Sequence, residues 1–321
     1  MSAATDGPWG APPEAIRDEA SLLDALGGTF EAKRVEAVAA RGQRRRRLAI
    51  GLALAGALAA WIVLTGQLPL PFVLFGFGMV LISGWAWQNA PVRRYARLVK
   101  GTAFEAALAA IGEGWTFRPE GGFDLATLKR FGILPSYDTA KQEDLMTGPY
   151  RGLPVAIGEL RLSERRGSGK NRRTVTTFHG LVVRIGLPKP HEAHTVVLRR
   201  MTSPGLFSSL ERVRLEDPSF EAAFNVFSTD QVAARTLLTT SFMERLRLLS
   251  DDLKAMGRRS DGRLTAAARD DTLLILVPCT TNLFEVRRVG EPDHLRTDLD
   301  RLLTEVRDVL AIADRLRLQA D

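Results

Sequence analysis

The feature that most constrains this chain is a pair of apolar segments without charge near its N-terminus. Residues 48–66 and residues 71–87 contain no Asp, Glu, Lys or Arg. At about 1.5 Å per helical residue, the first segment spans ~28 Å, close to the ~30 Å hydrocarbon core of a bilayer. Only residues 67–70 separate the two segments, so the helices must run antiparallel. We predict a transmembrane hairpin at residues 48–90, with spans at 48–66 and 71–88.

Most of the positive charge of the chain flanks this hairpin. The chain has a net charge of +7, and residues 41–100 hold nine basic and no acidic residues, which leaves −2 for the rest. The basic residues are Arg41, Arg44, Arg45, Arg46, Arg47, Arg93, Arg94, Arg97 and Lys100. Membrane topology and anionic headgroups account for such flanks. A nucleic-acid partner is therefore not expected, and both termini are predicted to be cytoplasmic.

Small residues recur at helical spacing within the two apolar segments. Gly51, Ala55 and Ala59 form one stripe, and Gly76 and Gly84 share a face of the second segment. Such stripes allow helices to approach closely. They allow either packing of the two spans on each other or oligomerisation through the hairpin.

The rest of the chain has the pattern of an α+β protein with a mainly antiparallel sheet. We predict an N-terminal helical segment at 1–47, interrupted at Gly27-Gly28, and a juxtamembrane helix at 91–112. The soluble domain is expected at 113–290, and a C-terminal helix with a heptad-like seam at 291–321. Expected strands are residues 155–162, 174–185, 194–199, 224–227, 264–268 and 273–277. Strands followed by helices favour α+β over a strictly alternating fold.

Three helix starts are predicted within residues 216–256. Asp217 is expected as an N-cap ahead of Pro218. Ser228 with Gln231, and Ser241 with Glu244, have capping-box spacing and predict helices over 229–238 and 241–256.

Residues 214–249, RLEDPSFEAAFNVFSTDQVAARTLLTTSFMERLRLL, and residues 177–183, TFHGLVV, carry a family resemblance. The sequence resembles the bacterial membrane proteins that carry domain of unknown function 3137, over about residues 30–290. The resemblance implies a bacterial inner-membrane location and this domain layout, but no reaction. Asp230, Arg235 and Glu244 match the family pattern, and each has a structural explanation. Asp230 lies at a predicted helix start, Arg235 is a candidate partner in an ion pair, and Glu244 belongs to a predicted capping box. Phe227 and Thr236 stand where tyrosines are expected.

A basic segment inside the soluble domain is a candidate contact for lipid or a partner. It carries Arg161, Arg165, Arg166, Lys170, Arg172 and Arg173 against Glu164 alone. In order of preference, we interpret this segment as a solvated hairpin loop, as a contact for anionic lipid headgroups, or as a contact for nucleic acid. The run around Gly169 and Lys170 does not fit a phosphate loop, because Asn171 replaces the required Ser or Thr.

No catalytic motif is present, so the chain is expected to be non-enzymatic and to need no cofactor. His191 and His194 are weak candidates for metal binding, which His179 and His294 could join. They do not form an HExxH motif, and on a strand they would point to opposite faces. Cys279 is the only cysteine, which excludes an intrachain disulfide; it is expected to be a buried thiol rather than a nucleophile.

The preferred functional hypothesis is an inner-membrane protein whose cytoplasmic domain binds a partner protein as a scaffold, with homo-oligomerisation as an option. The alternatives are a sensor of anionic lipid headgroups that uses residues 161–173, and a membrane-tethered, metal-dependent hydrolase built around His191 and His194.

Overall fold

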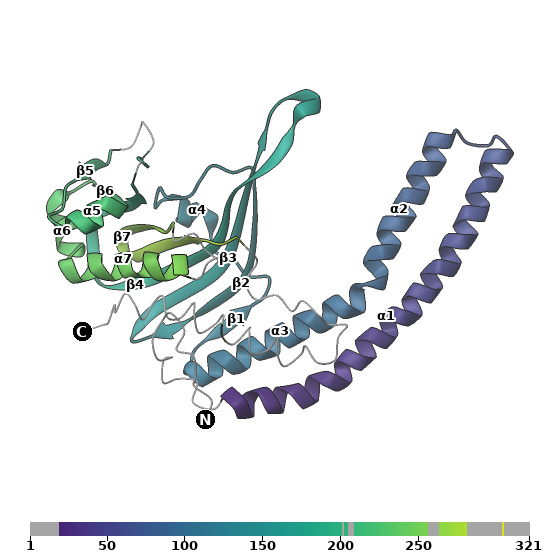
Figure 1. Ribbon diagram of the computed structural model, residues 1–321, viewed down its shortest axis with the longest axis horizontal. Helices are drawn as coiled ribbons and strands as arrows, with labels where there is room; N and C mark the ends of the chain where they lie inside the picture. Colours follow the sequence, from purple (N-terminus) through teal and green to yellow (C-terminus); the bar gives the residue numbers. More distant parts are fainter. Residues whose placement is uncertain (1–18, 201, 205–208, 256–262, 281–303, 305–321) are drawn as a thin grey trace. The chain divides into compact units, whose positions relative to one another are not determined.

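A computed structural model describes residues 19–200, 202–204, 209–255, 263–280 and 304. The described residues form two compact units, one up to residue 103 and one from residue 104. Figure 1 shows the long helices of the first and the sheet of the second.

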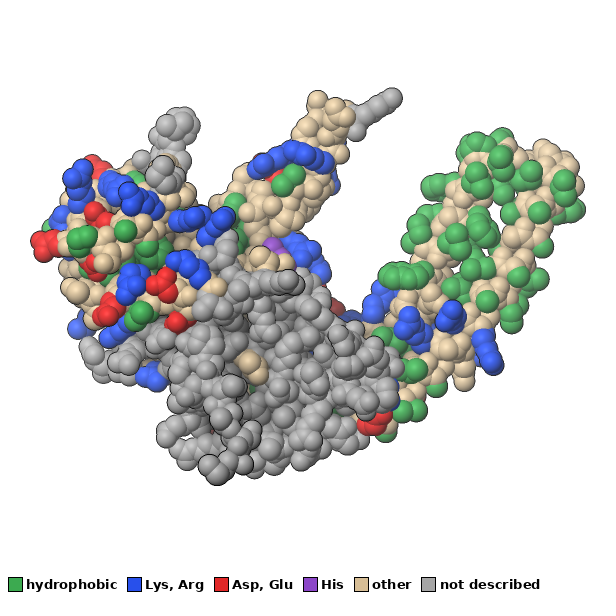
Figure 2. All heavy atoms as spheres, viewed as in Figure 1, with side chains coloured by type: hydrophobic (Ala, Val, Ile, Leu, Met, Phe, Trp, Pro, Cys, Tyr) green, Lys and Arg blue, Asp and Glu red, His purple; other side chains and the backbone are tan. Residues whose placement is uncertain are grey.

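The first unit is a helical hairpin. Helix α1 (Glu19–Leu64) and helix α2 (Leu70–Gln88) are joined by a short turn, and helix α3 (Ala90–Ile111) follows α2 and continues into the second unit. Helix α1 and the α2–α3 run are each long and apolar enough to cross a membrane, and none of their apolar windows is buried. Figure 2 shows hydrophobic side chains along both arms and basic side chains at their base. These two helices indicate membrane association, as the apolar segments predict.

One expectation for this unit is wrong: helix α1 is not interrupted at Gly27-Gly28. A glycine inside a helix costs only about 1 kcal/mol relative to alanine. The rest of a 46-residue helix outweighs that cost. The N-terminal helix and the first span are therefore one element.

The second unit is built on a seven-stranded antiparallel sheet. Its strands are β1 (Thr116–Arg118), β2 (Thr139–Tyr150), β3 (Leu153–Arg166), β4 (Arg173–Arg199), β5 (Glu211–Val213), β6 (Phe224–Ser228) and β7 (Thr265–Pro278). The strand order is β1-β2-β3-β4-β6-β5, and β7 also pairs with β4. The helices are α4 (Leu125–Lys129), α5 (Pro218–Ala223), α6 (Gln231–Leu237), α7 (Thr240–Ala255) and the 3-10 turn η1 (Gly169–Asn171). This confirms the α+β class with an antiparallel sheet.

The core of this unit lies on one face of the sheet. Leu160 and Leu162 of β3, Val182 of β4 and Leu274 of β7 are buried there together with Leu128 of α4. These residues alternate along their strands, as expected for a sheet that buries one side chain in two on this face. The opposite face is also buried at Ile157, Val183 and Ile275.

Strand β4 is longer than the sequence indicates, because it joins the two expected strands at 174–185 and 194–199. Pro188 and Pro190 lie between two pairings of β4. Before them, β4 ends its pairing with β3 at Ile185, opposite Val155; after them, it begins its pairing with β6 at Thr195. Proline is tolerated where no ladder hydrogen bond is needed. Strand β7 likewise joins two expected strands through Asp270, which has a φ of 55°.

The expected caps are partly wrong. Asp217 caps α5 as predicted, but α6 is capped by the side chain of Asp230, which accepts from the backbone N of Val232 and Ala233 at 2.7 and 2.9 Å. At α7, the Thr239 hydroxyl accepts from Phe242 N, so neither capping box forms as predicted. The heptad-like helix at 291–321 and His294 lie outside the described residues, apart from Thr304.

Candidate functional site

The basic segment predicted as a loop is mainly a two-stranded ribbon. Strand β2 last pairs with β3 at Ser163, and β7 last pairs with β4 at Gly180. Beyond those pairs, β3 and β4 pair with no other described strand, and they pair with each other from Glu164 with Val175 to Arg166 with Arg173. We call residues 164–175 the basic ribbon. Figure 1 shows it projecting from the sheet.

The root of the ribbon is tied to the segment before β2. Arg165 N donates to the Asp138 carboxylate at 2.6 Å, and the Ser136 hydroxyl donates to Glu164 at 3.4 Å. The Thr177 hydroxyl donates to Ser136 O at 3.0 Å. These bonds fix the direction in which the ribbon leaves the sheet, although its tip has no support from other strands.

The tip of the ribbon depends on two glycines in the left-handed region. Gly167 and Gly169 have φ of 88° and 58°, and they frame the turn η1. A Cβ on Gly167 would lie 2.6 Å from Asn171 O, whereas a Cβ on Gly169 would meet open space. The sequence run that fails as a phosphate loop is therefore a tight ribbon turn.

The ribbon presents positive charge to solvent. Its sequence holds five basic residues and one acidic residue, and the side chains of Arg165, Arg166, Arg172 and Arg173 are exposed. Within the ribbon they are opposed by Glu164, which forms an ion pair with Arg166 Nε at 2.8 Å. Figure 2 shows basic side chains on this projection. The structure therefore brings five of the six predicted basic residues into one ribbon.

Arg161, the sixth predicted residue, lies in the body of the sheet instead. It pairs with His179 across β3 and β4, and its Nη2 is 3.4 Å from His179 Nε2. The same His179 nitrogen lies 2.9 Å from the Glu159 carboxylate, and both of these side chains are largely buried. Sequence reasoning missed this buried pair; the signal was a glutamate inside the apolar run at residues 155–162.

The two candidate metal ligands on β4 have other partners. His191 is buried, and its Nε2 lies 2.7 Å from the Thr195 hydroxyl, which in turn lies 2.8 Å from the Ser228 hydroxyl. Burial lowers the pKa of His191, with Asp230 opposing and His194 adding to the effect. His194 Nε2 donates to Phe131 O at 3.0 Å.

Metal chemistry has no further support in this part of the chain. Across the described ranges, no three His, Cys, Asp or Glu side chains are grouped to hold a metal ion. The thiol of Cys279 is half-buried rather than fully buried, and it donates to Val277 O at 3.5 Å.

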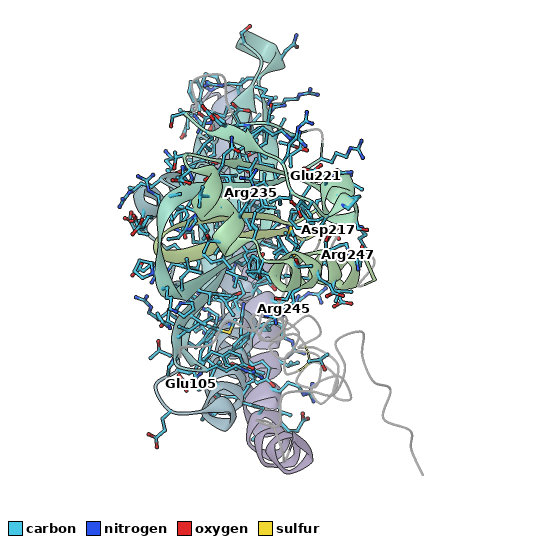
Figure 3. The ribbon with its side chains drawn as sticks, turned by 90° about the vertical axis from the view of Figure 1, so that its left-hand side faces the viewer. Glu105, Asp217, Glu221, Arg235, Arg245 and Arg247 are labelled. Carbon is cyan, nitrogen blue, oxygen red and sulfur yellow. The ribbon has the colours of Figure 1, made fainter. Side chains whose placement is uncertain are left out.

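The three residues of the family motif have structural contacts. Asp230 is the N-cap of α6. Arg235 donates to Arg214 O at 3.4 Å and to the Gln231 side chain at 3.5 Å. Glu244 is exposed on α7, away from the capping role assigned to it. Figure 3 labels Arg235 among the side chains of this unit.

The basic flanks of the membrane hairpin contact its tryptophans. Arg44 donates to Trp87 O at 3.0 Å, and its guanidinium lies 5.0 Å from the centre of the Trp87 ring. Arg93 donates to Ala86 O and lies 6.0 Å from the centre of the Trp85 ring. Trp and Arg side chains at one end of both helices fit an interfacial belt.

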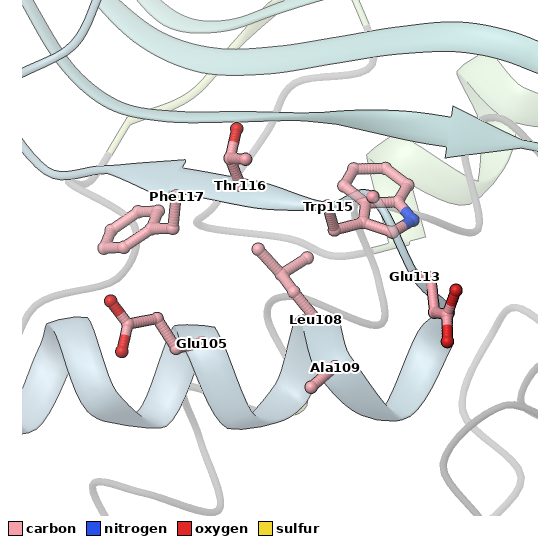
Figure 4. A pocket seen from close by; sticks show the side chains of 9 residues that line it. Glu105, Leu108, Ala109, Glu113, Trp115, Thr116 and Phe117 are labelled. Carbon is pink, nitrogen blue, oxygen red and sulfur yellow. The ribbon is translucent and has the colours of Figure 1, made fainter.

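Two hollows in the described part of the second unit differ in the side chains that line them. One hollow of about 490 Å³ lies between the end of α3 and β1 (Figure 4). Its described lining includes Glu105, Glu113, Trp115 and Thr116, without a histidine or a cysteine. Another, of about 190 Å³, is lined by Arg130 and Asp270, which form an ion pair at 3.5 Å.

Comparison with known proteins finds a family model that is similar to the C-terminal part of the chain. Residues 176–318 match the family described as "Protein of unknown function (DUF3137)". Both motifs that carry the resemblance lie inside this range, so the resemblance is confirmed there, although the match does not extend to residue 30. No curated protein matches the sequence. The crystal structure of the mycobacterial trehalose monomycolate transport factor A, TtfA, aligns over 68% of this chain and 96% of that chain, at 14% identity and a TM-score of 0.37. A TM-score this low does not indicate a shared fold.

Proposed function

We propose that this protein is a non-enzymatic, two-pass protein of the bacterial inner membrane whose cytoplasmic domain contacts anionic lipid headgroups through the basic ribbon. The observation that carries the proposal is the shape of the ribbon. Residues 164–175 stand clear of all other strands and hold five basic residues against Glu164. A projecting ribbon brings these charges to a flat surface without moving the sheet.

The energetics favour an anionic surface over an apolar partner. Each basic residue close to an anionic membrane contributes about 1 kcal/mol, so five supply roughly 5 kcal/mol before ordering costs. The ribbon exposes no large hydrophobic side chain, and Val232 is the only such residue strongly exposed between residues 104 and 280 in the described ranges. Protein interfaces depend on buried aromatic and aliphatic anchors, which this ribbon does not offer.

The test places the full-length protein in discs of neutral lipid and measures co-sedimentation with separate anionic vesicles. Neutralising Arg165, Arg166, Lys170, Arg172 and Arg173 to glutamine should weaken vesicle binding by roughly several thousandfold at low salt, following about 1 kcal/mol per charge. The control neutralises five exposed basic residues elsewhere, which are Arg118, Lys129, Lys141, Arg184 and Lys189. Equal losses in both variants would reduce the effect to net charge and refute a role for the ribbon.

The proposed orientation has its own test. Gln67 lies in the uncharged turn between the spans, and Ser168 lies at the ribbon tip. After Cys279→Ser, a single cysteine is introduced at either position. We expect a membrane-impermeant thiol reagent to label Gln67→Cys in cells with a permeabilised outer membrane, and Ser168→Cys only after lysis. Labelling of Ser168→Cys before lysis would invert the topology.

Protein assembly through the hairpin is a second candidate, and it keeps the scaffold hypothesis. Gly84 of α2 packs against Leu48 of α1, so one small residue is explained by packing of the two spans. A Cβ on Gly51 or Gly76 would meet nothing within 4 Å, so those positions are open to another helix.

Native mass spectrometry of the protein, purified in its own membrane lipids, tests this candidate. A second copy or another subunit that disappears in Gly51→Leu supports assembly. A bare monomer in the unaltered protein would remove that candidate. The matched control is Gly42→Leu, which also faces open space but lies before the apolar segment.

A further inference from the structure

The end of strand β4 carries a second basic region, which the sequence analysis did not identify. Two hollows of about 480 and 560 Å³ adjoin there and share Arg200 and Ala222 in their linings. We call them together the basic groove. Its basic side chains are Arg199, Arg200, Arg212, Arg247, Lys254 and Arg263, and its acidic side chains are Glu221 and Asp251.

Four elements of the fold bring these residues together. Arg199 ends β4 opposite Phe224 of β6, and Arg200 follows with its backbone N bonded to Ala223 O at 2.9 Å. Arg212 comes from β5, the outer neighbour of β6. Helices α5 and α7 are adjacent, and Figure 3 labels Glu221 and Arg247 on them.

Helix α7 turns one face toward the groove. Arg247, Ser250, Asp251 and Lys254 line it, and their spacing of three and four residues places them along one side of a helix. Asp251 accepts from Arg247 at 3.1 Å and from Lys254 at 3.0 Å. One carboxylate therefore holds two cations in position while neutralising only one positive charge.

The two acidic side chains of the groove are already engaged, whereas three arginines are not. Glu221 accepts from Leu215 N at 2.9 Å, and Asp251 bridges the two cations of α7. Arg199, Arg200 and Arg212 are exposed, and their guanidinium groups have no hydrogen bond or ion pair within the part of the chain that the structure describes. With six basic and two acidic side chains, the groove has a net charge of +4.

We propose that the basic groove is a binding site for a diphosphate-bearing ligand. A phosphate group offers several acceptor oxygens and a charge close to −2, which suit the fork of donors on an arginine. The two adjoining hollows each have their own cations, with Arg212 in the smaller and Arg247 in the larger, while Arg200 lies between them. Two linked phosphates therefore match the arrangement better than a single carboxylate does.

The groove is distinct from the basic ribbon and goes beyond the proposed function. The ribbon contains Arg173, the first residue of β4, whereas the groove contains Arg199, the last. Arg165 and Arg166 on the ribbon are exposed like Arg199 and Arg200, so they form a matched pair for comparison. Failure of one proposal leaves the other standing, because different substitutions and different readouts test them.

The experiment measures binding of inorganic pyrophosphate to the full-length protein in discs of neutral lipid by titration calorimetry. We expect saturable binding of one pyrophosphate per chain. Arg199→Gln with Arg200→Gln should weaken it about tenfold or more, since two charge-assisted donors are lost. Arg212→Gln should weaken it less, and Arg165→Gln with Arg166→Gln should leave it unchanged within about twofold.

Two results would overturn the proposal. The first is the absence of saturable pyrophosphate binding by the unaltered protein. The second is equal affinity in the groove variant and the ribbon variant while both retain the thermal unfolding temperature of the unaltered protein.

Repeating the titration in discs of anionic lipid identifies the source of the phosphate. The groove is assigned to a lipid headgroup if the unaltered protein binds pyrophosphate more weakly in anionic discs than in neutral discs, and if this loss is larger than the same loss measured for the ribbon variant. Unchanged affinity assigns it to a soluble phosphate ester. Either result upholds a phosphate site.

Discussion

The two ends of strand β4 carry similar charge on opposite shapes. At its start, the basic ribbon is a two-stranded projection with four exposed arginines. At its end, the basic groove is concave, and its cations come from the end of β4 and the residue after it, from β5, from α7 and from the segment before β7. Charge alone would assign both regions the same role. Shape separates them, because a projection meets an extended surface and a hollow encloses a small ligand.

The two regions also differ in what supports them. The groove lies over buried side chains, including Phe220 of α5 and Leu246 of α7, which are fully buried. The ribbon beyond Ser163 and Gly180 has its own cross-strand pairs and, at its root, the bonds to Ser136 and Asp138, and Val175 is half-buried. We therefore expect the groove to lose its shape only with global unfolding, whereas the ribbon can change locally.

The largest expected difference is in stability. Leu246→Ala removes a fully buried side chain and should lower the free energy of unfolding by about 2–5 kcal/mol, or the melting temperature by roughly 4–20 °C. Val175→Ala on the ribbon should cost less than about 1 kcal/mol. Thermal unfolding of both full-length variants in lipid discs makes the comparison, and similar shifts would show that the ribbon belongs to the same cooperative core.

A smaller difference is expected in salt dependence. Raising the salt from 50 to 500 mM shortens the screening length to a few ångströms, so vesicle binding by the exposed ribbon should fall about tenfold or more. Pyrophosphate binding in the groove should fall less, because partly enclosed charges are screened less. Vesicle sedimentation and calorimetry at matched salt concentrations measure how steeply each binding constant falls with salt. An equally steep fall in both would contradict the distinction between surface and hollow.

The turn of the ribbon allows a finer test with two neighbouring glycines. Gly167→Ala and Gly169→Ala both place alanine at positive φ, at a cost of about 1 kcal/mol each, but only the first meets a backbone oxygen at 2.6 Å. Gly167→Ala should therefore weaken vesicle binding about two- to fivefold more than Gly169→Ala does. Pyrophosphate binding should be unaffected in both, and any loss there would couple the ribbon to the groove.

The smallest effect concerns pH and the middle of β4. Burial lowers the pKa of His191, so the unfolded chain takes up its proton at a higher pH than the folded chain does. Stability is therefore complete above the unfolded pKa of about 6.5 and falls as the pH drops below it. His191→Gln keeps a partner for Thr195 and should flatten this dependence between pH 7.5 and 5.5. If the melting temperature of this variant depends on pH as in the unaltered protein, the loss of stability at low pH comes from other titratable groups.

The membrane hairpin could be predicted from sequence because its signal is local. Residues 48–66 and 71–87 need only length and the absence of charge to indicate a span. The cap of α5 was equally local, since Asp217 and Pro218 are adjacent. The caps of α6 and α7 were misassigned because Ser228, Asp230, Thr239 and Ser241 all have capping chemistry, and only the backbone conformation selects among them.

The candidate sites divide in the same way. The basic ribbon could be found in sequence because its five basic residues lie within nine residues, from Arg165 to Arg173. Its projection could not be predicted, because it depends on where β2 and β7 stop pairing. The basic groove had no sequence signal at all, since its cations extend from Arg199 to Arg263 and are scattered among many other arginines.

The sequence by itself determined the apolar hairpin, its basic flanks and the α+β class, because hydrophobic length, charge and short periodicity act between near neighbours. The tertiary structure alone decided that β4 runs unbroken past Pro188 and Pro190, that Arg161 lies beside His179, and that Arg200 meets the cations of α7. Those outcomes depend on pairing between distant segments, which no local pattern encodes.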